Sequence, residues 1–381
     1  AKQHNYAIGA FGVANLQFLE GIMQAAENCR SPVVLNLIES HFENYDFELL
    51  MQAVTAAARR ATIPVAVNFD HGKDIASAER AIAAGCNGVM VDTSALSLSD
   101  NLWQTRAIVR MAHALGITVE GELGYVPGVQ GESSKQHPGE LSYTSVAEAV
   151  GFVERTGVDC LAISIGTVHG RMKGAPKLDY ARLAKIKEAV AVPLVVHGGT
   201  GLTDDQFRRL IAYGISKINY YTGLADVANR CIREKFSEDR NGDHSVLVAG
   251  VRDAVRNEAE RCMQLWGCGG RAAEVLAQCK AWCNLERIVL HKVPASLSES
   301  EIASIMREGK ESLKSIPGVL SVRTGKVAQK GGLYHYCWLI QLTGKEALEA
   351  YMNHPTHQFF ASKTLDPLAD DRFILDFECQ D

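Results

Sequence analysis

Three histidines lie where apolar runs of the chain give way to polar turns that contain glycine. His71 occurs in "NFDHGK", His169 in "GTVHGR" and His197 in "VVHGGTG". Three imidazoles that meet at one point would suit a catalytic Zn²⁺ with one coordination position left open for substrate. The alternative is that each histidine caps its own strand or fills a gap at a rim. Three equivalent positions favour the metal site.

Carboxylates accompany these histidines. Asp70 directly precedes His71 and could orient a ligand, act as a fourth ligand or serve as a general base. Asp92 ends the next apolar run, and Glu122 lies in the following one, "VEGELG", where Glu120 shares its strand face. Asp92 and Glu122 could hold a second cation or orient the ligand histidines, while Asp92 alone could instead cap the turn after it.

Glycines near two of the histidines suggest an anion site. Glycine lets backbone N–H groups approach an anion closely, and barrels often bind phosphate near their seventh and eighth strands. A lysine and two hydroxyls could complete such a cradle. Its members would be Gly170, Lys173, Gly198, Gly199, Thr200, Gly201 and Thr222.

One long segment, "GYVPGVQGESSKQHPGELSYT", is rich in glycine, serine and proline. A loop of this length at the mouth of a barrel is usually a lid. Glu132 is its central acid and could enter the site when the lid closes. The other interpretation is an exposed loop with a solvated glutamate.

Eight β-rich runs alternate with amphipathic helical segments from the start of the chain to about residue 235. Such alternation implies βα units, and eight of them predict an α/β fold of the (β/α)8 TIM barrel type. An open doubly wound sheet would show a glycine fingerprint after its first strand, and "AFGVANLQ" is not one. With its closing helices, the barrel is expected over residues 1–275. The working face is then the carboxyl end of the strands, where the polar residues above lie.

A second pattern follows, which we expect over residues 286–381. Its order of strands and helices is β-α-β-β-α-β, which is typical of a small α+β domain with a ferredoxin-like fold.

Composition narrows the function classes. The 381 residues carry a net charge of −5 with both signs interspersed, so nucleic acid is not expected as a partner. No apolar run approaches the roughly 18 residues that span a bilayer, so no membrane partner is expected either. The ten cysteines form no CxxC pair, and even Cys279 and Cys283 are interpreted as buried thiols, which favours a reduced, cytoplasmic protein.

The ordered motifs "DHG", "VEGELG", "GTVHG", "LVVHGGTG" and "KINYYTGL" resemble the class II, zinc-dependent ketose-bisphosphate aldolases, which include fructose- and tagatose-bisphosphate aldolases. The resemblance implies an aldehyde-lyase that reversibly releases dihydroxyacetone phosphate and an aldehyde from a ketose phosphate or bisphosphate. It implies Zn²⁺ on His71, His169 and His197, where the metal stabilises the enediolate of the donor. Asp70 would move the proton of the C4 hydroxyl, and Asn219 would contact the donor.

Further roles follow from the same resemblance. The donor phosphate would lie beside a monovalent cation, Na⁺ or K⁺, on Gly170, Lys173, Gly198, Thr200 and Thr222. Glu132 would exchange a proton of the donor, and Arg271, in "GCGGRA", would bind the distal phosphate, in some relatives across a subunit interface. A homodimer or homotetramer is implied.

Several motifs depart from the family pattern. The first strand reads "AFGVAN", which makes Asn15 the expected polar contact there, and the turn after the second strand reads "LIESHFEN". "NYYTGL" brings Tyr220 and Tyr221 to the expected donor site. These changes leave open another metal-dependent lyase or an epimerase that acts on an unusual sugar phosphate.

The tail resembles the stress-responsive A/B barrel domains, small ferredoxin-like domains that pair into dimeric barrels. "ERIVLHKV" and "YMNHPTHQFF" carry the resemblance. His354 and His357 match an HPxH motif that some relatives use in catalysis. A role in dimerisation or packing is the alternative.

Overall fold

The computed structural model describes residues 1–124, 126, 143–171, 174–279, 283–294, 296–328, 332–366 and 371–379. The chain divides into two compact units. The first comprises Ala1–Ala78, Asn87–Arg110 and Thr118–Lys280. The second comprises Glu79–Cys86, Met111–Ile117 and Ala281–Asp381.

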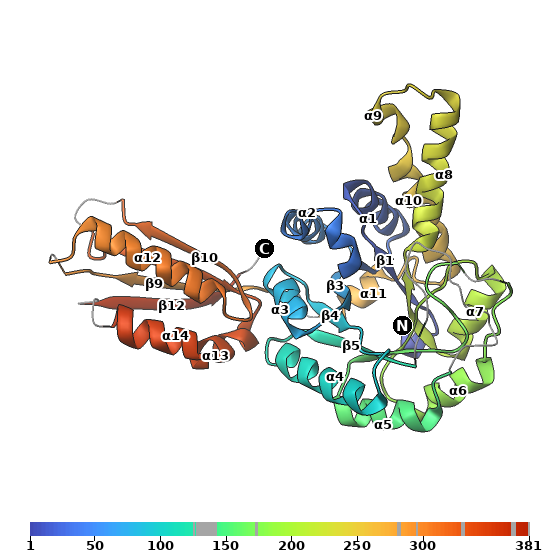
Figure 1. The fold of residues 1–381 in the computed structure, drawn as a ribbon, viewed down its shortest axis with the longest axis horizontal. Helices are drawn as coiled ribbons and strands as arrows, with labels where there is room; N and C mark the ends of the chain where they lie inside the picture. Colours follow the sequence, from blue (N-terminus) through green and yellow to red (C-terminus); the bar gives the residue numbers. More distant parts are fainter. Residues whose placement is uncertain are drawn as a thin grey trace. The chain divides into compact units, whose positions relative to one another are not determined.

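The first unit is built on a closed barrel of eight parallel strands, each paired with the next and the eighth with the first (Figure 1). Ala10 lies opposite Asn219 at the closing pair. This confirms the predicted TIM barrel. The strands are β1 (Ile8–Gly12), β2 (Val33–Ile38), β3 (Val65–Gly72), β4 (Gly88–Val91), β5 (Thr118–Leu123), β6 (Cys160–Ile163), β7 (Leu194–Val196) and β8 (Ile215–Tyr220).

Helices connect the strands and begin at side-chain caps that the sequence supplies. Ser145 and Glu148 form a reciprocal capping box at α5, and Thr203 and Gln206 form another at α7. The connecting helices are α1 (Leu16–Cys29), α2 (Phe47–Arg59), α3 (Ile75–Ala83), α4 (Leu98–His113), α5 (Val146–Thr156), α6 (Tyr180–Ala189) and α7 (Asp204–Tyr213). Short 3₁₀ helices cover Lys2–His4 (η1) and Glu39–Glu43 (η2).

Four helices close this unit: α8 (Thr222–Glu238), α9 (His244–Leu247), α10 (Val251–Leu265) and α11 (Ala272–Leu276). Helix α8 runs beyond the barrel beside α10, and α10 packs along α1 (Figure 1). Gly21 permits the close approach of α1 and α10, because a Cβ there would lie 2.7 Å from the carbonyl oxygen of Arg252.

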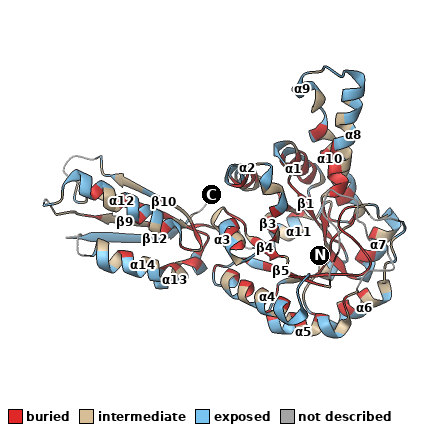
Figure 2. Cartoon of the chain, in the orientation of Figure 1, coloured by how far each residue is buried: buried red, intermediate tan, exposed pale blue. Residues whose placement is uncertain are grey.

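The most buried part of the first unit is the barrel. Its strands are almost entirely buried, whereas the outer faces of the helices are exposed (Figure 2). Among the buried polar side chains, those of Asp70, Glu120, Glu122, His169, His197 and Asn219 belong to strands β3, β5 and β8 or to the loops after β6 and β7. The polar interior therefore collects toward one end of the barrel.

The second unit contains a four-stranded antiparallel sheet with the order β10-β11-β9-β12. Together with its chain order this is a ferredoxin-like arrangement, as predicted. The elements are β9 (Leu285–His291), α12 (Glu299–Lys314), β10 (Val319–Lys326), β11 (Tyr336–Leu342), α13 (Lys345–Asn353), α14 (Pro355–Phe360), the π-helical turn η3 (Ala361–Leu365) and β12 (Arg372–Glu378). Trp338 is fully buried and packs edge-on against Phe360.

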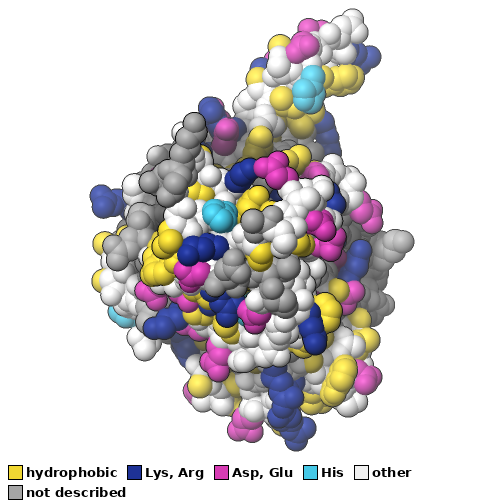
Figure 3. Space-filling model, turned by 90° about the vertical axis from the view of Figure 1, so that its left-hand side faces the viewer, with side chains coloured by type: hydrophobic (Ala, Val, Ile, Leu, Met, Phe, Trp, Pro, Cys, Tyr) yellow, Lys and Arg dark blue, Asp and Glu magenta, His cyan; other side chains and the backbone are white. Residues whose placement is uncertain are grey.

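The surface carries mixed charge. On the face shown in Figure 3, acidic and basic side chains alternate instead of gathering by sign. None of the helices in the described part of the chain is both long and apolar enough to cross a membrane.

Candidate active site

The end of strand β3 explains how two adjacent residues serve one site. Asp70 is 1% exposed and still follows the strand, whereas His71 adopts a left-handed conformation with φ of 52°. The pairing with β4 shifts register between Phe69 and Gly72. Because this irregularity breaks the alternation of side chains, both Asp70 and His71 can face the barrel mouth.

The three predicted histidines meet at that mouth. Their ring centroids lie 4.7 Å apart for His71 and His169, 5.0 Å for His71 and His197, and 5.4 Å for His169 and His197. The outer nitrogens are held by protein groups. Nδ1 of His71 lies 3.0 Å from Oδ2 of Asp92, and Nδ1 of His169 lies 2.9 Å from the carbonyl oxygen of Val126. His71 and His169 therefore present Nε2 inward, whereas His197 presents Nδ1, which lies 3.3 Å from Nε2 of His169.

Glu122 completes the cluster. Its Oε2 lies 3.1 Å from Nδ1 of His197, and one ligand atom each from Glu122 and the three histidines lie within 4.8 Å of one another. Nε2 of His71 is buried without a hydrogen-bond partner. Three imidazoles and one carboxylate are a donor set that suits zinc, and an unpartnered buried nitrogen is costly unless a ligand occupies it.

The nitrogen of His197 that points away from the cluster contacts a buried ion pair. Its Nε2 lies 2.8 Å from Oε1 of Glu120, whose Oε2 lies 2.5 Å from Nζ of Lys217. Burial alone would raise the pKa of Glu120, but Lys217 and His197 hold it well below its usual range. The sequence placed Glu120 on the same strand face as Glu122 but did not single out Lys217, although the spacing from Lys217 to Asn219 puts those two on one face of β8.

Asp70 is oriented by a chain of asparagines. Asn36 donates to its Oδ2 at 3.0 Å and Asn219 to its Oδ1 at 3.2 Å. Asn68 in turn donates to Oδ1 of Asn36 at 3.1 Å. Sequence reasoning did not assign Asn36 a role, and its only signal was a polar residue in the otherwise apolar run "VVLNLI".

The electrostatics of the mouth favour a cation. Burial and the two neighbouring imidazoles lower the pKa of His169 well below its ordinary value. Burial would also lower the pKa of His71, but the neighbouring carboxylates of Asp70 and Asp92 outweigh it and raise the pKa. A cation at the inward nitrogens would offset this concentration of buried carboxylates.

Asp92 and Glu122 thus occupy different positions. Asp92 binds Nδ1 of His71 and also accepts from the backbone and the hydroxyl of Ser94, which is the capping interaction considered for it. Glu122 lies on the inward side, among the histidines. Of the two alternatives for this pair, a second cation or orientation of the ligand histidines, the geometry favours orientation for Asp92. The place of Glu122 among the histidines corresponds to neither alternative, since it adds a carboxylate to the same group of possible ligands.

Comparison with known proteins decides the family. The profile "Fructose-bisphosphate aldolase class-II" matches residues 1–271. The chain belongs to the class II fructose-bisphosphate aldolase family. A fructose-bisphosphate aldolase from Geobacillus stearothermophilus is 36% identical over 278 residues, which cover 72% of this chain and 96% of that one. A sulfofructosephosphate aldolase from Alkalicoccus urumqiensis is 32% identical over 71% of this chain and 95% of its own length.

A solved structure and a second profile agree with this assignment. The crystal structure of the YdjI aldolase from Escherichia coli K12 covers 71% of this chain and 95% of its own, with a TM-score of 0.62 and 33% identity. Residues 285–379 match the profile "Stress Responsive A/B Barrel Domain". The chain is therefore a class II aldolase barrel joined to an A/B barrel domain.

The glycines assigned to the phosphate site lie in the loops after β6 and β7. Gly170 and Gly198 have positive φ of 75° and 71°. A Cβ at Gly198 would lie 2.0 Å from the carbonyl oxygen of Val168, so only glycine lets the two loops meet. Thr200 lies in the loop after β7, and Thr222 is buried in the first turn of α8.

Other assigned residues are not brought to the histidines. Asn15 caps α1, where its side chain accepts from the backbone N–H of Phe18. Arg271 pairs with Glu274 and lies over the ring of Tyr6, just before β1 begins, so within one chain it belongs to the opposite end of the barrel. Glu132 and Lys173 lie outside the described residues.

The two tyrosines at the end of β8 point to different parts of the structure. The expectation that both approach the donor site is wrong for Tyr220. Its hydroxyl donates to Glu258 on α10 at 2.8 Å, and its ring packs against Trp266. Tyr221 alone lies at the rim, where its ring centroid is 4.5 Å from that of His41. A residue-by-residue alternation along β8 accounts for the difference.

The histidines of the tail have structural partners. His354 caps α14 by accepting from the backbone N–H of Thr356 at 3.2 Å. His357 packs on Tyr351, with ring centroids 4.4 Å apart, and its Nδ1 lies 3.2 Å from the carbonyl oxygen of Met352. These contacts favour the packing role over a catalytic one.

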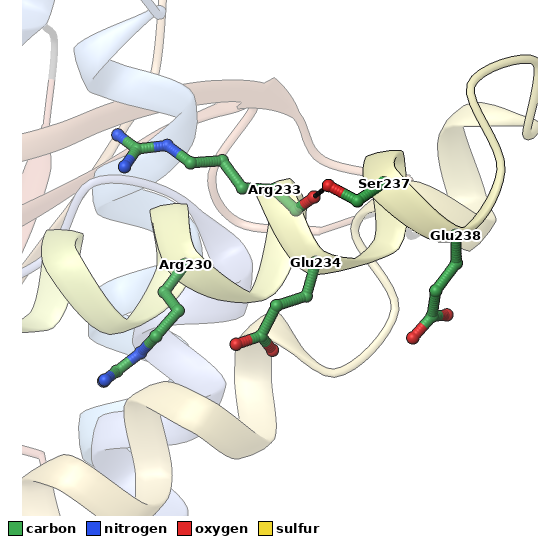
Figure 4. A pocket seen from close by; sticks show the side chains of 5 residues that line it. All are labelled: Arg230, Arg233, Glu234, Ser237 and Glu238. Carbon is green, nitrogen blue, oxygen red and sulfur yellow. Dashed lines mark hydrogen bonds between the residues drawn. The ribbon is translucent and has the colours of Figure 1, made fainter.

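A surface hollow on α8 is separate from this chemistry. Figure 4 shows Arg230, Glu234 and Glu238 projecting to one side of the helix and Arg233 to another. Ser237 donates to the carbonyl oxygen of Arg233 at 2.8 Å, an ordinary bond within a helix. The hollow is lined by side chains of both charges from a single helix, so it offers no set of converging groups comparable to the histidine cluster.

Proposed function

We propose that this protein is a zinc-dependent aldolase that reversibly cleaves a ketose phosphate or bisphosphate into dihydroxyacetone phosphate and an aldehyde. The observation that carries the proposal is the position of Asp70. Its carboxylate lies at the same barrel mouth as three converging imidazoles and is held by two asparagine amides. A base beside a cation site is what a carbon–carbon lyase of this family requires.

His71, His169 and His197 would hold the metal, with Glu122 beside them. When bound, zinc would supply Lewis-acid polarisation of the carbonyl of the substrate. The protein prepares the ligands. Asp92 holds His71 through Nδ1, and Glu120 holds His197 through Nε2, so each ring is fixed with its other nitrogen inward.

Asp70 would take the proton of the C4 hydroxyl during cleavage. The O–H electron pair then forms the aldehyde carbonyl, the C3–C4 bond breaks, and its electron pair stays on C3 of the donor fragment. In the reverse direction Asp70 returns the proton to the new hydroxyl. Asn36 and Asn219 fix both carboxylate oxygens, which suits a base that must reach one defined oxygen. We assign the proton exchange at C3 to Glu132.

The donor phosphate would lie between the loops after β6 and β7 and the start of α8. Backbone N–H groups at Gly170 and Gly198, hydroxyls of Thr200 and Thr222, and the backbone amides of the first turn of α8 would face it. Lys173 and a monovalent cation, Na⁺ or K⁺, would also bind at this phosphate site. Asn219, which links Asp70 and His197, would contact the donor itself.

We further propose a homodimer or homotetramer in the cytoplasm. Arg271 could reach a distal phosphate only on a neighbouring copy, because its own chain places it at the other end of the barrel. Asn15 would contact substrate only if it released its cap. None of the ten cysteines, all of which lie in the described part of the chain, forms a disulfide, which supports a reducing compartment.

A second candidate is another metal-dependent lyase or an epimerase that acts on an unusual sugar phosphate. Tyr221 at the rim favours it, since an aromatic ring there changes which substrates the mouth admits. Product analysis separates the two: an aldolase yields two fragments, whereas an epimerase yields an isomer of unchanged mass.

The test combines metal content with a half-reaction. We expect the purified protein to contain about one zinc per chain. We also expect it to exchange with solvent a proton on the hydroxymethyl carbon of dihydroxyacetone phosphate, which corresponds to C3 of the ketose, and NMR in D₂O would detect this exchange. Asp70→Asn should keep the zinc and lose carbon–carbon cleavage by about 100-fold or more. Protein that binds no divalent metal at the histidines, or an Asp70→Asn variant with full cleavage, would contradict the proposal.

A further inference from the structure

A second polar cluster lies at the barrel mouth beside the catalytic one. His41 belongs to η2, directly after β2, and its ring packs on Tyr221. Nδ1 of His41 and the hydroxyl of Tyr45 are buried and have no hydrogen-bond partner. Tyr45 lies near enough to Tyr221 for the two phenols to interact electrostatically. Buried polar atoms without partners are rare, and two in one cluster indicate a place where a ligand supplies them.

The barrel order places this cluster in one sector of the mouth. Tyr221 follows β8 and covers the end of β1, where a Cβ on Gly12 would lie 2.7 Å from its ring. His41 follows β2, and β2 pairs with β3, so that Ile38 lies opposite Asp70. The cluster thus spans the sector from β8 through β1 to β2, next to the proposed base. The glycine loops of the proposed phosphate site follow β6 and β7, on the other side of Asn219.

The three side chains of this cluster are uncharged, and carboxylates adjoin it. Burial lowers the pKa of His41, although Asp70 opposes this, so the imidazole stays uncharged at neutral pH. Burial raises the pKa of Tyr45 and of Tyr221, which keeps both phenols neutral. Glu39, two residues before His41, is buried and accepts from the backbone N–H of Lys73 at 2.6 Å. Neutral donors next to carboxylates suit hydroxyl groups and disfavour a phosphate, which is normally bound by cations or helix N-termini.

We propose that His41, Tyr45 and Tyr221 form the aldehyde subsite, and that the aldehyde carries hydroxyl groups but no phosphate. The substrate would then be a ketose with a single phosphate, at the donor end. This inference rests on the proposed aldolase function and specifies its substrate class. Tyr45 and His41 would hydrogen-bond the hydroxyls, and the Tyr221 ring would pack on the carbon chain.

The first experiment compares aldehydes in condensation with dihydroxyacetone phosphate. Glyceraldehyde and erythrose are matched with glyceraldehyde 3-phosphate and erythrose 4-phosphate. We expect kcat/KM to be at least about tenfold higher for each unphosphorylated aldehyde than for its phosphorylated counterpart, as for a site whose polar groups match the substrate hydroxyls. A preference for the phosphorylated aldehydes would overturn the inference.

The second experiment uses Tyr45→Phe and His41→Leu, with Tyr213→Phe as the matched control. Tyr213 lies on α7 just before β8 begins, at the opposite end of the barrel. We expect the KM for glyceraldehyde to rise roughly 3- to 10-fold in the first two variants, the value of one hydrogen bond, and to stay unchanged in the control. The loss in condensation should exceed any loss in proton exchange of dihydroxyacetone phosphate. Equal losses in the two reactions, or no change in KM for glyceraldehyde, would contradict the subsite.

The proton-exchange reaction distinguishes the aldolase proposal from the aldehyde-subsite proposal. Wild-type protein that fails to exchange the proton of dihydroxyacetone phosphate would refute the aldolase proposal itself. Wild-type protein that exchanges the proton but prefers phosphorylated aldehydes would leave the aldolase proposal standing and refute only the uncharged aldehyde.

Discussion

At the scale of single residues, the site depends on buried charges that hold one another. Glu120 lies between Lys217 and His197 and is 4% exposed. A buried pair of this kind contributes little net stability, but loss of one partner leaves an uncompensated charge in the barrel interior. The position of His197 therefore depends on Lys217, which touches no proposed ligand atom of the metal.

Replacement of Lys217 tests this dependence. We expect Lys217→Met to lower the free energy of unfolding by about 3 kcal/mol, because Glu120 would be left buried without its cation. The double variant Lys217→Met with Glu120→Gln should recover part of that loss, since no unpaired charge remains. Urea unfolding monitored by circular dichroism measures both. Lys235→Met, which breaks an exposed pair with Glu238, is the control and should change little. Equal effects of the two lysine variants would mean that the buried pair is not important for stability.

The residues that the sequence predicted are those with a distinctive type at a distinctive place. His71, His169, His197 and Asp70 each end an apolar run, so both the residue and its position at the rim could be recognised. Asn36 and Lys217 lie within strands, and their contacts depend on which strands become neighbours across the barrel. That pairing is a tertiary property, which no local pattern in the sequence records.

At the scale of elements, the loops after β6 and β7 position two of the three imidazoles. Gly198 combines a positive φ with a close approach to Val168, whereas Gly201, in the same loop, has φ of 89° and open space around it. Comparing the two glycines distinguishes backbone strain from steric contact. Backbone strain occurs at any left-handed position, whereas the steric contact occurs only at Gly198, where the two loops meet.

Alanine at these two glycines should give different results. Gly201→Ala introduces only left-handed strain, which costs about 1 kcal/mol. Gly198→Ala adds a contact that must push the loops apart, so we expect a larger loss of stability and at least about tenfold weaker zinc binding through displaced His169 and His197. Denaturant unfolding and competition with a zinc chelator measure these effects. If both variants behave alike, the loop contact does not set the metal site.

The order of strands and helices was predictable because β-rich runs and amphipathic helical segments are clearly distinguishable in the sequence. Strands and helices alternate regularly in the first unit, which predicts the barrel. The β-α-β-β-α-β order of the second unit predicts its ferredoxin-like fold. No local pattern in the sequence marks the irregularity in β3, although two adjacent side chains must reach one mouth. The structure explains it with the left-handed His71 and the register shift next to Gly72. The separation of Tyr220 from Tyr221 was missed because the end of β8 could not be fixed to a single residue.

At the scale of the whole molecule, the relatives indicate that the second domain is additional to the aldolase barrel. The alignment with the aldolase from Geobacillus stearothermophilus covers 96% of that protein but only 72% of this chain. The barrel alone thus corresponds to an entire relative, and the A/B barrel domain is an addition. Its strand β12 is exposed along all seven residues (Figure 2). Phe373, Leu375 and Phe377 are 48%, 47% and 39% exposed.

These three side chains belong to one face of the sheet. Phe373 and Leu375 pair with Leu290 and Ile288 of β9, which are only half-buried, whereas Val289 on the opposite face is buried under the helices. An exposed apolar sheet face with an open edge strand is unfavourable in an isolated domain. A second copy of the same domain would cover it, in line with the proposed homo-oligomer.

A charge on this face should therefore weaken self-association. We expect Leu375→Glu to give a smaller assembly than the wild type, because burial of the introduced carboxylate without a partner would be costly. Leu333→Glu is the matched control, since Leu333 lies in the same domain and is 62% exposed outside the sheet strands. Sedimentation velocity over a range of protein concentrations measures the mass of each. If Leu375→Glu keeps the mass of the wild type, the sheet face is not the contact. If the wild type is itself a monomer, the proposed oligomer is wrong as well.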